Sequence, residues 1–151
     1  MKRNKTREMK HMQTKDLFFL STATGTKEKF VPRGDVVSLY VCGVTPYAMA
    51  HMGHARCYVS FDVLHRLLLW AGYAVQYVQN ITDVDDKIVR KAQDALQPGQ
   101  SLAEEAVGIA RRYAAAFNED MDRLRVLRPG HQPRISDNMP AIISFIEELI
   151  A

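Results

Sequence analysis

The sequence predicts an α/β fold with a parallel sheet, and three consecutive segments carry that prediction. Residues 36–41 are a nearly continuous apolar run of strand length, as expected for a strand buried on both faces of a sheet. A helical pattern follows over residues 53–71, and residues 74–81 form a second apolar strand. A strand, a helix and a strand at this spacing make a βαβ unit, which requires parallel strands and a right-handed crossover.

The first helix should pack one apolar face on this sheet. That face consists of Val59, Val63 and Leu67, with Leu64 and Leu68 beside it. Gly72 suits the position just after the helix, where a left-handed backbone favours glycine. Before the unit, residues 17–20 predict a short strand, and residues 22–34 are rich in turn residues.

Helices are expected over the second half of the chain. One begins at Thr82-Asp83 and runs to about Ala95, and the next begins at Ser101, which with Glu104 matches a capping box. The apolar stripe of that helix is Val107, Ala110, Ala114, Phe117, Met121 and Leu124. A last helix is expected from Met139 to the end of the chain. We expect it to bury Ile142, Ile143, Ile146 and Ile150.

The length is enough for one compact domain with a core, and residues 17–151 are expected to be the N-terminal portion of a Rossmann-like domain. The first 16 residues are rich in lysine and arginine and predict a disordered tail rather than an arm that contacts phosphate. Two cysteines, Cys42 and Cys57, do not form a disulfide framework and favour a reduced, cytoplasmic setting. We interpret Cys57 as a packing residue. No apolar run reaches the length of a membrane span.

The most informative motif is His51-Met52-Gly53-His54, at the junction between the first strand and the first helix. Ligands of parallel sheets bind beyond the carboxyl ends of the strands. A helix N-terminus there favours anions, above all phosphate. Gly53 leaves room for a nucleotide against the backbone. The two imidazoles can donate hydrogen bonds to phosphate oxygens, and would do so more strongly when protonated. Alone, the motif is equally compatible with two histidines that cap the helix or face solvent.

Three motifs together carry a family resemblance. They read Tyr40-Val41-Cys42-Gly43-Val44-Thr45-Pro46-Tyr47, Ala50-His51-Met52-Gly53-His54-Ala55-Arg56 and Tyr77-Val78-Gln79-Asn80-Ile81-Thr82-Asp83-Val84-Asp85-Asp86-Lys87. In this order and spacing they resemble the first half of the Rossmann-like catalytic domain of the cysteinyl-tRNA synthetases, which are class I aminoacyl-tRNA synthetases. The second motif matches the class signature His-Ile-Gly-His. The resemblance runs from about Leu17 to the end of the chain.

The resemblance implies ATP-dependent activation of cysteine to cysteinyl-AMP and its transfer to tRNA(Cys), a ligase reaction of protein biosynthesis. In the family, the counterparts of His51 and His54 stabilise the transferring α-phosphate, with Gly53 in the ATP site. Cys42, Gly43, Thr45 and Thr82 correspond to the cysteine-binding region. The resemblance also implies Mg²⁺ on the ATP phosphates. It further implies that Cys42 is one ligand of an active-site Zn²⁺ that selects the substrate thiolate over a hydroxyl, with the other ligands outside this chain.

Other polar residues have plainer interpretations. His65 and His131 are expected on the surface. Asp83, Asp85 and Asp86 favour the positive end of a helix dipole and do not match a calcium loop. Thr82 could also serve as a helix N-cap, which is compatible with substrate binding.

Two features depart from the family pattern. Many members read Cys-Gly-Pro-Thr-Val-Tyr-Asp where this chain reads Cys42-Gly43-Val44-Thr45-Pro46-Tyr47-Ala48. The Thr-Pro-Tyr loop also resembles the related mycothiol-pathway ligase, which joins cysteine to an amino sugar. The family's catalytic domain continues further, so this chain is expected to be an N-terminal fragment that is inactive by itself. Two alternatives to a tRNA ligase stay open: the amino-sugar ligase, and an inactive truncated paralogue that acts as a binding fragment.

Overall fold

Two long strands form the centre of the fold. It is described from a computed structural model that covers residues 15–151, so the tail prediction falls almost entirely outside the described residues. β3 (Val36–Val44) and β4 (Ala74–Ile81) pair in parallel, with a register irregularity between Val41 and Val44. Parallel bridges from β4 to His131 and Arg134 place an extended segment along its other edge. The α/β class and the parallel sheet are therefore confirmed.

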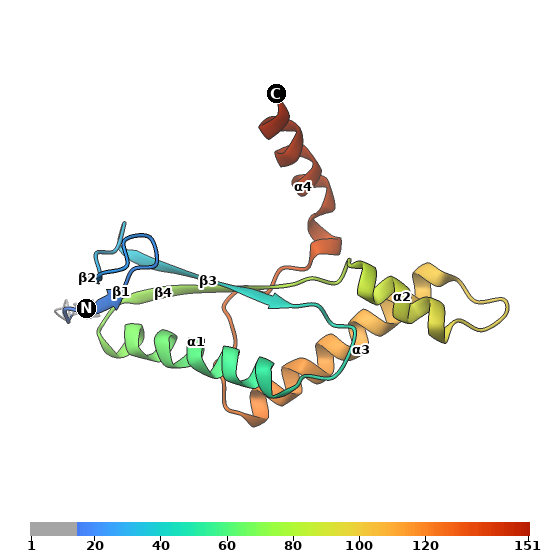
Figure 1. Cartoon of the computed structure of the whole chain (residues 1–151), viewed down its shortest axis with the longest axis horizontal. Coiled ribbons are helices and arrows are strands. Elements are labelled where there is room, and N and C mark those ends of the chain that lie inside the picture. The colour runs from blue at the N-terminus through green and yellow to red at the C-terminus, as the bar shows by residue number, and fades with distance from the viewer. Residues whose placement is uncertain (1–14) are drawn as a thin grey trace, which may run out of the picture.

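Helices cover one face of this sheet and leave the other open (Figure 1). α1 (Met52–Trp70) joins β3 to β4, and α3 (Leu102–Arg123) lies beside it on the same face. α2 (Asp86–Ala95) follows β4 and packs against α3 beyond the strand ends. α4 (Ile135–Ile150) projects from the opposite side of the sheet. None of the helices formed by residues 15–151 is long and apolar enough to cross a membrane.

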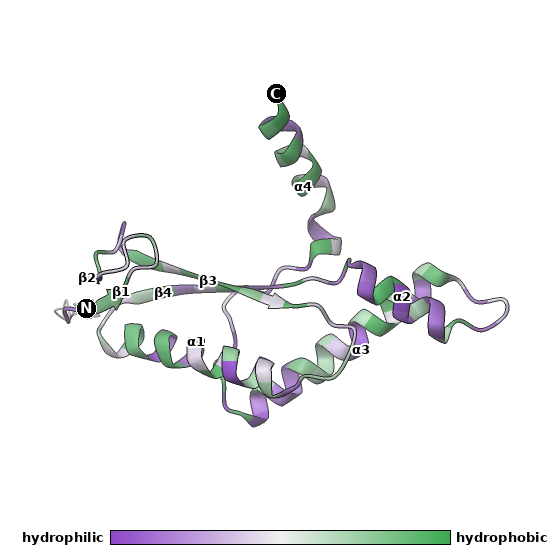
Figure 2. Ribbon diagram, in the orientation of Figure 1, coloured by the Kyte–Doolittle hydropathy of each residue, from purple (hydrophilic) through white to green (hydrophobic). Residues whose placement is uncertain are grey.

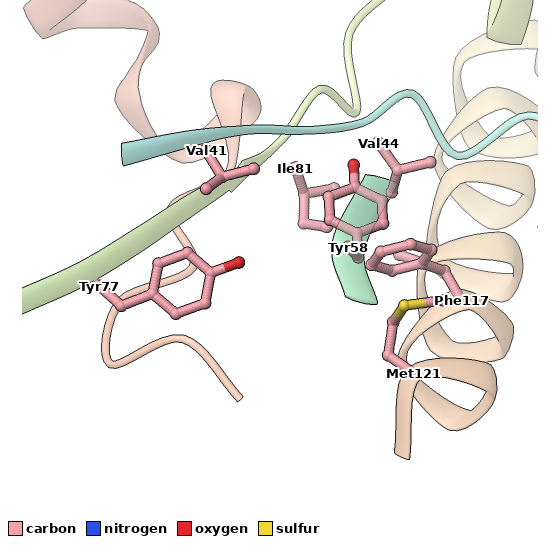
Figure 3. Close-up of a cluster of buried hydrophobic side chains, with 8 residues drawn as sticks. Val41, Val44, Tyr58, Tyr77, Ile81, Phe117 and Met121 are labelled. Carbon is pink, nitrogen blue, oxygen red and sulfur yellow. The ribbon is translucent and has the colours of Figure 1, made fainter. Parts of the chain in front are cut away.

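The main core lies between the sheet, α1 and α3 (Figure 3). Its buried residues are Val41, Val44, Tyr58, Tyr77, Ile81, Ala114, Phe117 and Met121. The rings of Tyr58 and Phe117 meet edge to face, with centroids 5.0 Å apart. This core fixes the first turns of α1 beneath the end of β3, where the sequence motifs lie.

Two smaller clusters hold the ends of the molecule. β1 (Phe18–Leu20) pairs antiparallel with β2 (Lys27–Lys29), which lies within the segment expected to be turn-rich. Leu17 and Val37 pack with the end of α1 near this hairpin. The second cluster joins α2 to α3 through Ile88, Ala92, Ile109 and Ala110.

The predicted inner face of α1 is partly wrong. Val59 and Val63 are 39% and 61% exposed. The buried positions are Tyr58, Asp62, His65 and Leu68. The hydropathy pattern misses this face because two of its members are polar. His65, expected on the surface, packs its ring against Tyr77, with centroids 5.0 Å apart, and its Nδ1 has no hydrogen-bond partner among the described residues.

Asp62 is buried because it joins α1 to the loop after α3. Its carboxylate accepts from the backbone N–H of Leu127 at 2.9 Å and from Arg66 Nε at 2.6 Å. The Arg66 guanidinium also donates to the Arg125 carbonyl at 2.7 Å. A buried carboxylate with these partners is satisfied, so its burial is compatible with a stable fold.

The helix caps explain where the later helices begin. α2 begins at Asp86 rather than at residue 82, because Asp85 is the N-cap and accepts from the Lys87 N–H at 2.8 Å. α3 begins after Ser101 as predicted, and four residues of its predicted stripe are buried. The outer two, Val107 and Leu124, are exposed.

α4 differs most from the sequence prediction. It begins at Ile135, four residues before the predicted start, and none of its residues is fully buried. The expected burial of its isoleucines is wrong, since Ile143 and Ile146 are 49% exposed and Ile150 is 81% exposed. The helix leaves the sheet from its N-terminal end, and its largely apolar surface lies open along its length (Figure 2).

Candidate active site

The predicted site residues lie at and just beyond the carboxyl ends of β3 and β4. Val44 of β3 pairs with Ile81 of β4 at this edge, and the loop after β3 leads directly into α1 (Figure 1). The hydroxyl of buried Tyr58, in the second turn of α1, donates to the carbonyl of Cys42 at 3.2 Å. Burial raises the pKa of the Tyr58 hydroxyl, so it stays a hydrogen-bond donor. This bond holds the start of α1 against the end of β3.

His51 and His54 cap the start of α1 reciprocally. His51 is the N-cap, and its Nδ1 accepts from the backbone N–H of Gly53 at 3.0 Å. The Nδ1 of His54 accepts from the backbone N–H of His51 at 3.2 Å. The two rings lie face to face at a 33° tilt, with centroids 4.0 Å apart. The helix-capping role that the sequence left open is therefore real.

This cap determines which proton each ring carries. An Nδ1 that accepts a hydrogen bond is unprotonated, so each neutral ring carries its proton on Nε2. The Nε2–H groups remain available as donors to a ligand. For His54, protonation of Nδ1 would break its bond from the His51 N–H, which favours the neutral form of that ring over the protonated form considered from the sequence. Burial and the neighbouring His51 both lower the pKa of His54.

The ring of His51 packs against the backbone at Gly53 and leaves no space there for a side chain. A Cβ at this position would lie 2.8 Å from Cε1 and 2.9 Å from Nδ1 of His51. Any side chain would therefore displace the ring that caps the helix. The space above Gly53 is filled by the signature's own histidine, a constraint that the sequence did not reveal.

Asn80 is a polar residue at the strand ends to which the sequence analysis assigned no role. Its Oδ1 accepts from the backbone N–H of Gly43 at 2.7 Å and from the Tyr40 hydroxyl at 3.0 Å. Its Nδ2 donates to the Thr82 hydroxyl oxygen at 2.9 Å. One amide side chain thus joins the end of β3 to the end of β4. The sequence signal that could have indicated this role is an asparagine one residue before the end of β4, across from Gly43 of β3.

Gly43 allows the two strands to approach each other closely. A Cβ there would lie 1.4 Å from the Asn80 carbonyl oxygen, so no other residue fits without moving a strand. The Thr82 backbone N–H donates to the Val44 carbonyl at 3.0 Å, which continues the contact between the two strands. Thr82 is not the cap of α2, because Asp85 occupies the N-cap position of that helix. Thr45 lies in the turn that follows, where its carbonyl accepts from the Tyr47 N–H at 3.0 Å.

The site residues therefore form two groups. Gly43 and Thr82 belong to the network of Asn80, and His51, Gly53 and His54 form the cap. Across the part of the chain that the structure describes, no hydrogen bond links these two groups. They share the same edge of the sheet, as the sequence predicted.

The described residues do not by themselves form a metal site. Cys42 is exposed at the end of β3, and no group of three His, Cys, Asp or Glu side chains within residues 15–151 could hold a metal ion. One thiol supplies at most one of the three or four protein ligands that zinc takes. Cys57 is also exposed, so its predicted packing role is wrong.

The three aspartates after β4 have separate roles. Asp85 caps α2, and Asp86 lies in its first turn, as helix electrostatics predicts. Asp83 instead accepts from the backbone N–H and the hydroxyl of Ser136 at 3.0 and 2.7 Å, and so caps α4. Burial alone would raise the pKa of Asp83, but its hydrogen bonds from Ser136 and Arg134 lower it.

Comparison with known proteins relates this site to one family. The family model described as "tRNA synthetases class I (C) catalytic domain" matches residues 29–151. A cysteine–tRNA ligase of Gloeobacter violaceus is 52% identical over 130 residues, which are 85% of this chain and 26% of that protein. The chloroplastic/mitochondrial cysteine–tRNA ligase of Arabidopsis thaliana is 45% identical over 137 residues, 90% of this chain and 23% of that protein.

The chain thus spans about a quarter of the length of these curated relatives. The region matched by the family model contains β3, β4, all four helices of the described residues and every predicted site residue. The chain belongs to the family of class I (C) tRNA synthetase catalytic domains.

Proposed function

We propose that this chain carries part of the active site of a cysteine–tRNA ligase. The reaction is the activation of cysteine by ATP to cysteinyl-AMP, followed by transfer to tRNA(Cys), in the cytoplasm. The main support is the reciprocal cap of His51 and His54, which presents two Nε2–H donors at a helix N-terminus beyond the strand ends. The curated relatives described above are named for this activity.

The two histidines would act on the α-phosphate of ATP. When the carboxylate of cysteine attacks that phosphorus, negative charge develops on the phosphoryl oxygens. Donors that are already oriented stabilise this charge at no further cost of reorganisation. The cap fixes both rings before the substrate arrives, so Gly53 contributes by leaving the His51 ring in place. Mg²⁺ would accompany the ATP phosphates.

Thr82 would bind the substrate cysteine. Because its hydroxyl oxygen accepts from Asn80 Nδ2, its own proton remains free for a substrate acceptor such as a carboxylate. Gly43 would let the substrate approach the backbone closely, but it would not donate a hydrogen bond to it, since its N–H already donates to Asn80 Oδ1. Thr45 belongs to the loop that borders this edge.

Cys42 would supply one ligand to a zinc ion. The thiol is accessible at the strand end, but it would need further ligands from outside the described residues, including the substrate thiolate. The residues described here do not fit a zinc ion without them. Zinc content of purified protein, compared with a Cys42→Ser variant, tests this point directly.

Cysteine-dependent exchange of pyrophosphate into ATP tests the whole proposal. The assay should use the longest gene product that carries residues 1–151, with serine as the competing amino acid. Exchange with cysteine that is lost in a His51→Ala, His54→Ala variant supports the ligase. Exchange that then yields an amino-sugar conjugate but no charged tRNA would identify the alternative ligase. Absence of exchange with a folded protein would favour the inactive paralogue.

A further inference from the structure

The side chain of Asn80 has a fixed orientation between the two strand ends. Its Oδ1 accepts from the backbone N–H of Gly43 at 2.7 Å and from the Tyr40 hydroxyl at 3.0 Å. A backbone N–H can only donate a hydrogen bond, so the Asn80 atom that faces Gly43 must be the amide oxygen and not the amide nitrogen. The amide therefore cannot be flipped without losing the bond to Gly43.

This orientation of Asn80 determines where the proton of the Thr82 hydroxyl can point. With Oδ1 turned toward Gly43, Nδ2 faces Thr82 and donates to its hydroxyl oxygen at 2.9 Å. An amide nitrogen does not accept hydrogen bonds, so the Thr82 hydroxyl cannot donate back to it. Within residues 15–151, this is the one hydrogen bond of the Thr82 hydroxyl. Its proton therefore points away from Asn80 and is available to a ligand.

We propose that Asn80 is a positioning residue for the substrate amino acid, because it holds the Thr82 hydroxyl as a hydrogen-bond donor toward the carboxylate of cysteine. The inference rests on the proposed function, which places cysteine at this edge of the sheet. Of the ammonium and the carboxylate of free cysteine, only the carboxylate accepts hydrogen bonds. A hydroxyl that presents its proton therefore matches the carboxylate. Because Asn80 orients this hydroxyl before cysteine arrives, binding does not have to order it.

Replacement of Asn80 by aspartate reverses the direction of this hydrogen bond with little change in shape. One carboxylate oxygen still accepts from the Gly43 N–H. The other oxygen has no proton to donate, so it can pair with the Thr82 hydroxyl only by accepting from it. The Thr82 proton then turns toward position 80, and the hydroxyl presents its lone pairs to the substrate carboxylate. Asn80→Asp should therefore weaken the binding of amino acids that carry a carboxylate.

The test is the dissociation constant of cysteine, measured by isothermal titration calorimetry without ATP on the longest gene product that carries residues 1–151. Cysteamine, which is cysteine without its carboxylate, is the second probe. Asn80→Asp should weaken cysteine binding about tenfold, since a hydrogen bond to a charged group is lost, and should not weaken cysteamine binding. Asn118→Asp is the matched control, because it changes another part-buried amide, which donates to Gln132 at 3.2 Å. The control should leave both constants within about twofold of the unmutated protein.

Two further variants separate the hydroxyl from the added charge. Asn80→Ala removes the donor without adding a charge, so the Thr82 hydroxyl becomes free to rotate, and cysteine binding alone should weaken about threefold. In a Thr82→Val background, Asn80→Asp should change cysteine binding by less than about threefold, because the hydroxyl through which Asn80 acts is gone. Thermal melts verify that each variant is folded, and Asn80→Ala decides the question if Asn80→Asp is not.

Kinetics of pyrophosphate exchange give an independent readout. The negative charge of the cysteine carboxylate is consumed as its oxygen bonds to phosphorus, so a hydrogen bond to that charge is not strengthened in the transition state. Asn80→Asp should therefore raise the KM for cysteine about tenfold and leave kcat and the KM for ATP within about twofold. A general distortion of the site would instead lower kcat as well.

Equal losses of cysteine and cysteamine binding in the Asn80 variants would overturn the inference, because the contact would then be to the ammonium or the thiol. So would an undiminished loss in the Thr82→Val background, which would show a direct effect of charge, or an equal loss in Asn118→Asp. A protein that does not bind cysteine would overturn this inference and the proposed function together. A protein that binds cysteine with the predicted selectivity but performs no exchange would contradict the adenylation activity and not the role of Asn80.

Discussion

Replacement of Gly53 by alanine separates the structural role of the signature from its chemical role. The backbone at this position is helical, so alanine is allowed there. The added Cβ would nevertheless lie within 2.9 Å of the His51 ring, which must then move away. We predict that Gly53→Ala stays folded but loses the fixed orientation of His51.

Two effects of opposite sign determine the stability of this variant. Alanine is favoured over glycine inside a helix by about 0.5–1 kcal/mol. Loss of the N-cap hydrogen bond costs about 1 kcal/mol. The free energy of unfolding should therefore change by less than about 0.5 kcal/mol, which corresponds to a melting shift of at most about 2 °C for a domain of this size.

Gly108 provides the matched control. It lies inside α3, and a Cβ there meets nothing within 4 Å. Gly108→Ala should gain the full helix preference and raise the melting temperature by about 2–4 °C. Side-chain ¹⁵N NMR then measures the tautomeric state of the His51 ring. His51 should show one fixed tautomer in Gly108→Ala and a mixture of tautomers in Gly53→Ala. The same gain in both variants, with unchanged His51 signals, would refute the proposed ring position.

Three further perturbations test other contacts. Asn80→Ala should lower the melting temperature by about 4–10 °C, because about 2–3 kcal/mol of hydrogen bonding is lost. Asn80→Asp keeps the acceptor oxygen but loses the N–H donor to Thr82, so its melting temperature, measured by the same calorimetry, should fall by less. Burial lowers the pKa of His65, so the contribution of this histidine to stability is complete above its unfolded pKa and is lost as the pH falls from about 6.5 toward the folded pKa. His65→Gln should flatten this part of the curve of stability against pH. An unchanged curve would contradict the role given to His65. Hydrogen bonds lower the pKa of Asp83, so its cap on α4 should be lost as the pH falls below about 4; Asp83→Asn should remove the corresponding transition in far-UV circular dichroism.

The sequence predicted those parts of the fold that depend on local pattern. The apolar runs of β3 and β4 and the helix between them identified the parallel unit, and Gly72 marked its turn with a φ of +93°. The signature was correctly placed at the start of α1. Hydropathy, turn residues and motif spacing each depend only on residues that are close together in the sequence.

Contacts between distant residues could not be predicted in this way. Asp62 and His65 are buried on α1 because the loop after α3 and the Tyr77 ring meet them there. α4 begins early because Asp83, more than fifty residues away, caps it. The role of Asn80 likewise depends on the register between two strands, which brings Gly43 opposite it.

The most direct measurement of the central claim is the single-turnover rate of cysteinyl-AMP formation by a His54→Ala variant of the longest gene product that carries this chain. His131→Ala is the control, since that side chain is exposed and lies away from α1. If His54 stabilises the transferring phosphate, its loss should lower the rate on the order of 10²-fold or more, with little change in ATP binding. The control should react normally. A normal rate in His54→Ala, together with a lowered melting temperature, would show that the histidine only caps the helix and would contradict the proposed mechanism.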